Sequence, residues 1–199
     1  MARVFVLLYG AICYLIFLPT FLYAIAFIAG IGPKHIDNGP LEPFATALLI
    51  DLALLGVFAV QHSGMARPAF KRWWTRWIPA PIERSTYVLV SSLALILLLW
   101  QWRPLPQIVW QANGEAAQAV LLALSALGWV LVFASTFLIN HFDLFGLRQV
   151  WLYAKNRPSP DVPFVVRALY RIVRHPLMLG FLIAFWATPT MSVGHLLFA

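Results

Sequence analysis

The chain has 199 residues, of which 62% are apolar and 11% are charged. A soluble domain carries about 25% charged residues, so this composition excludes an ordinary soluble protein and indicates a membrane protein. The formal net charge of +7 does not point to nucleic acid, because 11 of the 14 Lys and Arg residues lie in two connections between apolar blocks. We therefore expect a single integral membrane domain over residues 1–199, with the lipid bilayer as its surroundings.

Four long blocks that carry at most one charge are each able to cross a bilayer as a helix. About 20 apolar residues at 1.5 Å per residue match a hydrocarbon core of about 30 Å. Gly30 and Pro33 end the first block, and Pro43 suits the first turn of the second, where its missing N–H is not needed. The predicted fold class is all-α, a polytopic membrane helix bundle, with full spans at about 4–29, 43–63, 86–102 and 116–139.

The last apolar block is interrupted. Residues 177–187 amount to about 16 Å of helix, which is half a bilayer. Thr188 and Pro189 then match a capping residue followed by proline at the first helical position. We therefore expect a C-terminal helical hairpin that enters the bilayer and turns back, with limbs at about 177–187 and 189–199. The second limb is expected to be cut off at Ala199, before it returns to the cytoplasm.

The basic residues are distributed in the way that sets membrane orientation. Connection 64–85 holds five Lys or Arg residues and connection 140–176 holds six, whereas the other two connections are nearly neutral. By the positive-inside rule, both basic connections and the N-terminus lie in the cytoplasm, which predicts a multi-pass protein of the inner (cytoplasmic) membrane. Aromatic and basic residues are mixed from Phe70 to Trp77, as in a segment that lies in the membrane interface.

Polar side chains inside a membrane are costly, so each is a functional candidate. Asp51 is the one charged residue of the second span, and Gln61 and His62 lie at its cytoplasmic end. Asp51, Phe58 and His62 share one helix face, because the 11 residues from Asp51 to His62 make very nearly three turns. The alternative is that Asp51 is protonated or hydrogen-bonded between helices and serves packing only.

A second group of polar residues follows the fourth span. Asn140, His141 and Asp143 are interleaved with aromatic residues there. Because the second and fourth spans both end on the cytoplasmic side, we expect His141 to face Gln61 and His62. The alternative is that these side chains only cap a helix end at the interface.

The most specific motif opens the last apolar block. Pro176 suits the first position of the hairpin helix, which makes His175 its cap. Backbone donors exposed at this helix start, with Arg174 beside them, form a site for an anion such as the carboxylate of a zwitterionic cofactor. Tyr170 and nearby aromatic residues are able to pack on an adenine ring or to face a sulfonium by cation–π attraction.

This motif, continued by Gly180, resembles the cofactor motif of the isoprenylcysteine carboxyl methyltransferase-like group of integral membrane enzymes. Stretches 61–71, 140–150 and 170–195 look closer to the methanethiol S-methyltransferases within that group. The resemblance implies S-adenosylmethionine as the cofactor, held by a set of residues around the hairpin start: Tyr170, Arg174, His175, Pro176, Leu179 and Gly180. The wider group completes its cofactor site with an acidic pair and tyrosines after the second limb, a segment that would follow Ala199.

The resemblance also implies the reaction, which is methylation of a small volatile thiol, methanethiol, to dimethyl sulfide at the cytoplasmic side. A thiol is a poor nucleophile until it is deprotonated, and histidine is the usual base at neutral pH. The residues expected to act on the thiol are the candidate bases His62 and His141, their possible orienting partners Asp51 and Asp143, and the substrate contacts Gln61 and Asn140. We expect no metal site.

Two alternatives belong to other functional classes. The first is a haem-binding electron carrier that uses His62 and His141 as axial ligands. It leaves the motif from Arg174 to Pro176 unexplained, because a haem site needs no anion-binding helix start. The second is a non-catalytic membrane protein that keeps the methyltransferase architecture and is linked to nitrogen-oxide metabolism.

Overall fold

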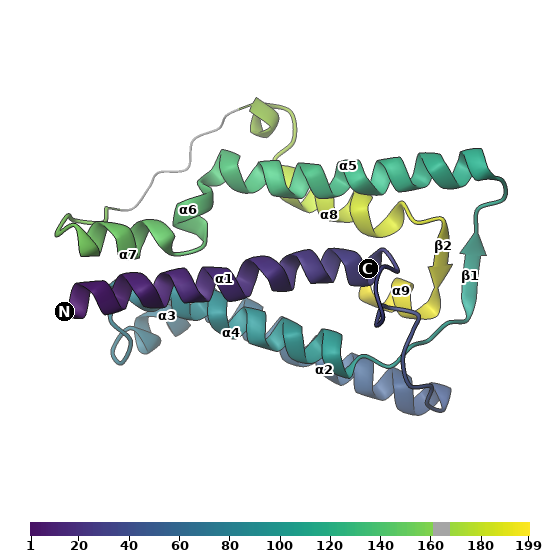
Figure 1. Ribbon diagram of the computed structural model, residues 1–199, viewed down its shortest axis with the longest axis horizontal. Coiled ribbons are helices and arrows are strands. Elements are labelled where there is room, and N and C mark those ends of the chain that lie inside the picture. The colour runs from purple at the N-terminus through teal and green to yellow at the C-terminus, as the bar shows by residue number, and fades with distance from the viewer. Residues whose placement is uncertain (161–167) are drawn as a thin grey trace. The chain divides into compact units, whose positions relative to one another are not determined.

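The computed structural model describes residues 1–160 and 168–199 (Figure 1). These residues form mostly helices and one pair of short strands. The helices are α1 (Ala2–Ile28), α2 (Phe44–Met65), α3 (Pro68–Trp74), α4 (Ala80–Gln101), α5 (Glu115–Ile139), α6 (His141–Leu144), α7 (Leu147–Ala154), the 3-10 helix η1 (Ala168–Arg171), α8 (Pro176–Trp186) and α9 (Val193–Phe198), and the strands are β1 (Ile108–Gln111) and β2 (Thr190–Ser192).

Helices α1, α2, α4 and α5 are long and apolar enough to cross a membrane. They confirm the predicted all-α, polytopic membrane fold and its four full spans. The shorter apolar helix α8 follows as the first limb of the predicted hairpin, at Pro176–Trp186.

Helix α4 begins earlier than predicted, at Ala80 instead of Thr86. The predicted boundary followed the end of the charged residues, but a helix is able to continue beyond the hydrocarbon layer. Glu83 lies in the first turn of α4, where a negative charge is favoured by the helix dipole. Its carboxylate also lies 3.3 Å from the Lys71 ammonium. The start of the helix is therefore stabilised by charges that the apolar pattern does not include.

A strand pair replaces part of the predicted second hairpin limb. Strand β2 pairs antiparallel with β1, which belongs to the connection between α4 and α5. The paired residues are Ile108 with Ser192, Trp110 with Met191 and Gln111 with Thr190, with an irregularity between Ile108 and Trp110. The prediction of a helix over 189–199 was therefore wrong for its first residues, because their backbone groups bond to β1 instead.

Helix α9 begins at Val193, and Thr188 and Pro189 do not open it. The Thr188 hydroxyl donates to the backbone oxygen of Thr190 at 2.9 Å, so it acts within the turn before β2. The cap of α9 is Ser192, whose Oγ accepts from the backbone N–H of His195 at 3.0 Å. Serine is a favoured capping residue. Threonine followed by proline was the stronger sequence signal for a helix start, so the prediction placed the start at Pro189.

The chain forms two compact units, and the first comprises residues 1–23, 53–100 and 140–160. Close contacts in this unit require glycine at two positions. A Cβ on Gly10 would lie 2.6 Å from a methyl carbon of Val150. Gly146 has a positive φ of 83°, and a Cβ there would lie 2.7 Å from the backbone nitrogen of Ser85. The Val150 side chain of α7 therefore packs directly against the backbone of α1, and Gly146, directly before α7, lies against Ser85 of α4.

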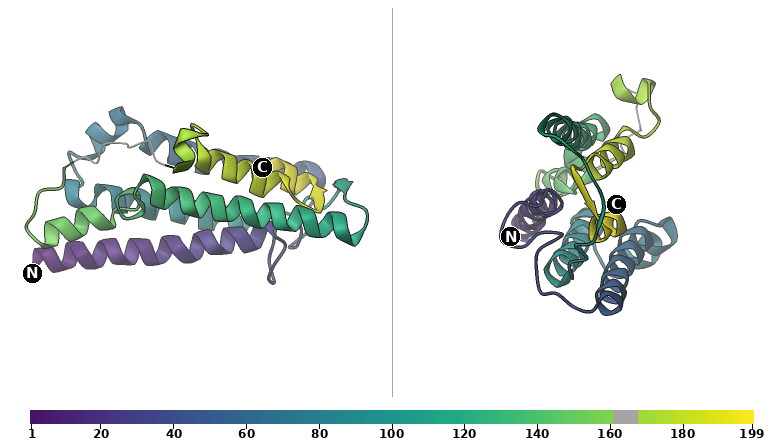
Figure 2. Two further views of the ribbon diagram at one scale, coloured as in Figure 1. Left: turned by 90° about the horizontal axis from the view of Figure 1, so that it is seen from above. Right: turned by 90° about the vertical axis from the view of Figure 1, so that its right-hand side faces the viewer.

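The second unit comprises residues 24–52, 101–139 and 168–199. Its main contact is between α5 and α8, which run side by side in both Figure 1 and Figure 2. A Cβ on Gly128 would lie 2.5 Å from the backbone nitrogen of Ala184, and one on Gly180 would lie 2.8 Å from that of Val132. The two backbones thus approach as closely as small residues allow, which is a common way for helices to associate in membranes.

We predict that Gly128→Ala destabilises the protein, because the added methyl group has to displace the backbone of α8. The expected loss is about 1–3 kcal/mol, the usual cost of overpacking, and thermal unfolding in detergent would measure it. Gly56→Ala is the matched control, since a Cβ on Gly56 of α2 has no neighbour within 4 Å. A Gly128→Ala protein that unfolds at the same temperature as the Gly56→Ala protein would contradict the packing described.

Candidate functional site

His62 lies on α2 in the first unit, within a cluster of polar and aromatic side chains. Its ring stacks on Phe58 with a centroid distance of 5.4 Å and an interplanar angle of 17°, so these two residues share a helix face as predicted. The Tyr87 hydroxyl lies 3.2 Å from each ring nitrogen of His62, and Ser91 Oγ lies 3.3 Å from Nδ1. Gln61 Nε2 donates to the same Ser91 oxygen at 3.2 Å. Tyr87 and Ser91 were not predicted from the sequence.

His141 is the first residue of α6 and belongs to the same unit. It is buried, and its Nε2 lies 2.8 Å from the Tyr14 hydroxyl of α1. The ring of His141 also makes edge-on contacts with Tyr14, Phe142 and Phe145, at centroid distances of 5.7, 5.6 and 4.8 Å. Burial lowers the pKa of His141 below its ordinary value. The imidazole is therefore neutral near pH 7 and able to accept a proton.

The two histidines have different neighbours. His62 contacts Tyr87 and Ser91 of α4, whereas His141 contacts Tyr14 of α1 and Phe145. The expectation that His141 faces His62 finds no support among these contacts. It had been based on the shared membrane side of the two helix ends, which does not determine how the side chains are directed.

Asn140 precedes His141 in a backbone conformation that is unusual for a residue with a side chain. Its φ is 141° and its ψ is 88°, in a region that is costly for any residue except glycine. The side-chain oxygen of Asn140 accepts from the backbone N–H of Asp143 at 3.3 Å. Asn140 is therefore the cap of α6, as in the capping interpretation considered for this segment.

Asp143 is bonded to α7 and not to a histidine in the part of the chain that the structure describes. Its Oδ1 accepts from Arg148 Nη1 at 2.9 Å and from Gln149 Nε2 at 3.3 Å. These contacts hold α6 and α7 together. The hypothesis that Asp143 orients a histidine base receives no support from them.

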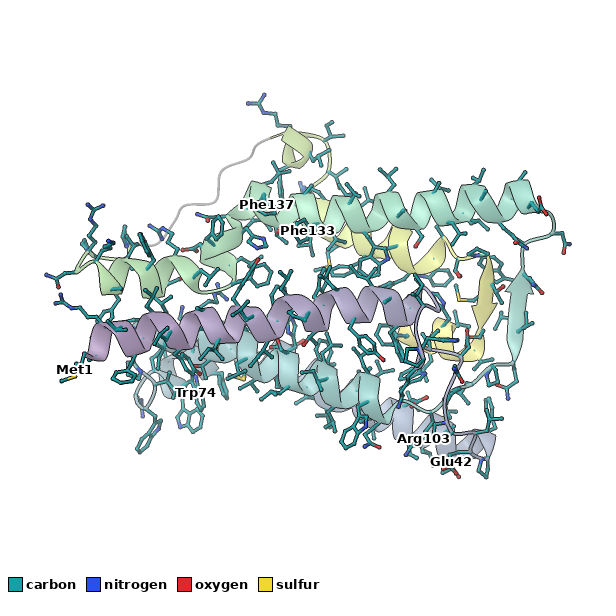
Figure 3. The ribbon with its side chains drawn as sticks, viewed as in Figure 1. Met1, Glu42, Trp74, Arg103, Phe133 and Phe137 are labelled. Atoms are coloured by element: carbon teal, nitrogen blue, oxygen red, sulfur yellow. The ribbon has the colours of Figure 1, made fainter. Side chains whose placement is uncertain are left out.

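Asp51 is a fully buried carboxylate in the second unit, whereas Gln61 and His62 belong to the first. Its Oδ1 accepts from the backbone N–H of Arg103 at 2.9 Å, in the connection that follows α4 (Figure 3). Its Oδ2 is buried and has no hydrogen-bond partner among residues 1–160 and 168–199. The contact with Arg103 matches the packing interpretation of Asp51.

The predicted cofactor residues lie in the second unit, from η1 into the first turns of α8. Pro176 is the first residue of α8 and His175 is its N-cap, as predicted, although the side chain of His175 makes no capping hydrogen bond with the described residues. Arg174 and His175 are exposed, and Tyr170 is partly buried in η1. Gly180 lies in the close contact with Val132 of α5. The Leu179 N–H donates to the His175 backbone oxygen at 3.0 Å, which closes the first turn of the helix.

Comparison with known proteins connects these residues with a family. The family model described as NnrU protein matches residues 50–198. The chain is 54% identical over 200 residues to the methanethiol S-methyltransferase of Mycobacterium tuberculosis, covering 100% of this chain and 82% of that protein. It is 55% identical over 200 residues to the protein of the same name from Crocosphaera subtropica, covering 100% and 78%. Nurim from Pan troglodytes is 34% identical over 171 residues, covering 82% and 63%. No solved structure matches the chain.

We predict that His141 makes the stability of the protein depend on pH. Because burial holds the folded-state pKa of His141 below its ordinary value of 6.5, the unfolded chain takes up the proton first as the pH falls. Stability is then full above about pH 6.5 and decreases as the pH falls from there toward the folded-state pKa. The measurement is thermal unfolding between pH 8 and pH 5 of the wild type and of His141→Gln.

The variant His141→Gln serves as the control for other buried groups, because it keeps them all. Burial also lowers the pKa of His195, so both proteins are expected to lose stability in acid. The wild type is expected to lose more of it than His141→Gln. Parallel curves for the two proteins would show that His141 titrates as an exposed histidine does.

Proposed function

The chain belongs to the NnrU protein family and to the family of the methanethiol S-methyltransferases, and from this premise we propose that it methylates methanethiol to dimethyl sulfide. The observation that carries the proposal is the identity of 54% and 55% to two proteins of that name over the whole chain. The proposed methyl donor is S-adenosylmethionine, and the proposed place of reaction is the cytoplasmic side of the inner membrane. The surplus of Lys and Arg in connections 64–85 and 140–176 supports that orientation.

The residues at the start of α8 suit the carboxylate of S-adenosylmethionine. The side chains of Arg174 and His175 are exposed directly before Pro176. Since no side chain among the described residues caps this helix, its first-turn N–H groups are available to an anion, and Arg174 adds a charge-assisted partner. When bound there, S-adenosylmethionine would supply its sulfonium methyl group to the thiol sulfur and would leave as S-adenosylhomocysteine, which keeps the electron pair of the broken C–S bond.

His141 is the favoured base for the proton of the thiol. Its imidazole is neutral near pH 7 because burial lowers its pKa. When the S–H bond breaks, the sulfur keeps the electron pair and the proton passes to the imidazole. The Tyr14 hydroxyl oxygen, 2.8 Å from Nε2, is able to accept from the N–H of the protonated ring. Tyr14 thereby supports the charged form of His141 at the moment when it is needed.

His62 is the second candidate base, and Gln61 beside it is the candidate substrate contact. The Oε1 atom of Gln61 is buried and has no hydrogen-bond partner in the described part of the chain, so it is able to accept from the S–H of a thiol. The aromatic rings of Phe58 and Tyr87 on either side of His62 supply apolar surface for a methyl group. A small thiol with one polar atom matches these surroundings.

The haem hypothesis is less consistent with the contacts of the two histidines. A ring nitrogen of His141 is bonded to Tyr14, and both ring nitrogens of His62 lie within 3.2 Å of the Tyr87 hydroxyl. Either histidine would have to change its contacts to bind iron. The non-catalytic alternative differs from our proposal in one observable, which is binding of the cofactor without methylation of a thiol.

We predict that His141→Ala lowers the turnover number by about 10²- to 10⁴-fold, the usual contribution of a general base. The affinity for S-adenosylhomocysteine is expected to stay unchanged, because the cofactor residues are others. Headspace detection of dimethyl sulfide measures the first quantity and calorimetry the second. His35→Ala, which removes a histidine from the connection after α1, is the control. Full turnover in both His141→Ala and His62→Ala would mean that the thiol proton leaves by another route.

We predict that Arg174→Ala weakens the binding of S-adenosylhomocysteine by roughly 10- to 150-fold, which corresponds to the loss of a charge-assisted hydrogen bond of about 1.5–3 kcal/mol. His175→Ala is expected to weaken binding in the same direction. Calorimetry on purified protein gives both affinities without turnover. Arg171→Ala removes another exposed cation three positions before Arg174 and is expected to bind normally. Wild-type affinity in both Arg174→Ala and His175→Ala would refute the assignment of the cofactor site.

A further inference from the structure

A cleft in the first unit has no part in the proposed reaction. Its volume is about 410 Å³, within the range of about 300–1,000 Å³ that small-molecule sites occupy. Its walls come from α3 and the residue after it, the first turns of α4, Asp143 of α6, and α7 with the residues that follow it. Helix α2 ends at Met65 and α4 begins at Ala80. The cleft therefore lies at the start of the span α4, beside the connection that leads to it from α2.

The charges that line this cleft leave an excess of guanidinium groups. The carboxylate of Glu83 lies 3.3 Å from the Lys71 ammonium, and that of Asp143 lies 2.9 Å from the Arg148 guanidinium. Both carboxylates in the wall are thus neutralised by a partner. Arg84 and Arg157 also line the cleft, and neither forms an ion pair with a carboxylate among residues 1–160 and 168–199.

Hydroxyl groups accompany the two guanidinium groups. Tyr153 and Ser159 line the same cleft. The guanidinium carbon of Arg84 lies 6.0 Å from the centre of the Tyr87 ring, a contact with the face of the ring that does not use the N–H donors of the guanidinium. Guanidinium and hydroxyl donors gathered around one cavity are the usual partners of a phosphate group, which accepts several charge-assisted hydrogen bonds.

Helix α3, which forms one wall, has the composition of a segment in the headgroup layer. The rings of Phe70, Trp73 and Trp74 pack on one another with centroid distances of 5.4 to 6.1 Å, and Trp74 is labelled on α3 in Figure 3. The side chains of Trp73 and Trp77 are exposed. Exposed indoles beside basic residues are typical of protein that lies at headgroup depth.

We propose that this cleft binds the phosphate of an anionic membrane lipid, with Arg84 and Arg157 as its ligands. A phosphate dissolved in water has the same chemistry, but it would gain nothing from the indoles of α3, whereas a lipid brings its glycerol and acyl groups against them. Basic pockets at the ends of membrane spans are known sites for lipid headgroups. The bound lipid would connect α3, the start of α4 and the end of α7, and it does not depend on the methyltransferase proposal.

The test measures how many phosphatidylglycerol molecules the purified full chain retains in native mass spectrometry, after reconstitution in phosphatidylcholine bilayers with and without phosphatidylglycerol. The double variant Arg84→Gln with Arg157→Gln is expected to bind phosphatidylglycerol at least about tenfold more weakly. The matched control is Arg72→Gln with Arg76→Gln, which removes the same amount of charge from connection 64–85, at residues outside the cleft wall. It is expected to retain phosphatidylglycerol as the wild type does.

Three results would overturn the proposal. The first is equal loss of phosphatidylglycerol in the two double variants, which would show a general attraction to positive charge. The second is complete displacement of phosphatidylglycerol by inorganic phosphate, which would show that the cleft selects the ion and not the lipid. The third is unchanged retention of phosphatidylglycerol in the single variant Arg157→Gln. Arg157 is exposed and lies after the end of α7, so its substitution is expected to leave the fold intact. This single variant therefore decides the question if the double variant does not fold.

Discussion

Hydrocarbon offers no hydrogen bonds, so a polar side chain on a membrane-spanning helix needs a partner within the protein. Several hydroxyl groups on the spans satisfy this constraint locally. Thr20, Ser92 and Ser135 each donate to the backbone oxygen four residues earlier, at 2.7 to 2.8 Å. The constraint separates side chains that are satisfied within one helix from those that reach another element. The second kind includes Tyr14, whose partner is His141, and Asp51, whose partner is Arg103.

The same constraint divides the candidate site residues by role. Asp143 and Asn140 use their polar atoms to hold α6 and its connection to α7, and Asp51 holds the chain after α4. Gln61 keeps a buried oxygen without a hydrogen-bond partner among the described residues, and His141 is neutral near pH 7 and lies beside the Tyr14 hydroxyl. Unused hydrogen-bonding capacity and a neutral imidazole are what a thiol substrate requires. For this reason we propose Gln61 as a substrate contact and His141 as the favoured base, and structural roles for the aspartates.

The spans could be predicted from the sequence because a bilayer imposes both length and composition on a helix. The start of α8 could also be predicted, since Pro176 has one favoured position in a helix. The strand pair β1–β2 could not, because it depends on backbone bonds between residues 108–111 and 190–192. Tyr14 and Tyr87 were missed for a related reason. They lie 127 and 25 positions from the histidines that they contact, and an aromatic residue on an apolar helix gives no local signal of such a bond.

The central claim is that the chain transfers a methyl group to methanethiol. In the most direct measurement, isolated membranes that contain the chain are given methanethiol and S-adenosylmethionine whose methyl group carries deuterium. The gas above the membranes is then analysed by mass spectrometry. Our account predicts dimethyl sulfide that carries one labelled methyl group, at a rate far above that of membranes without the chain. Binding of S-adenosylmethionine with no labelled dimethyl sulfide above that background would contradict it.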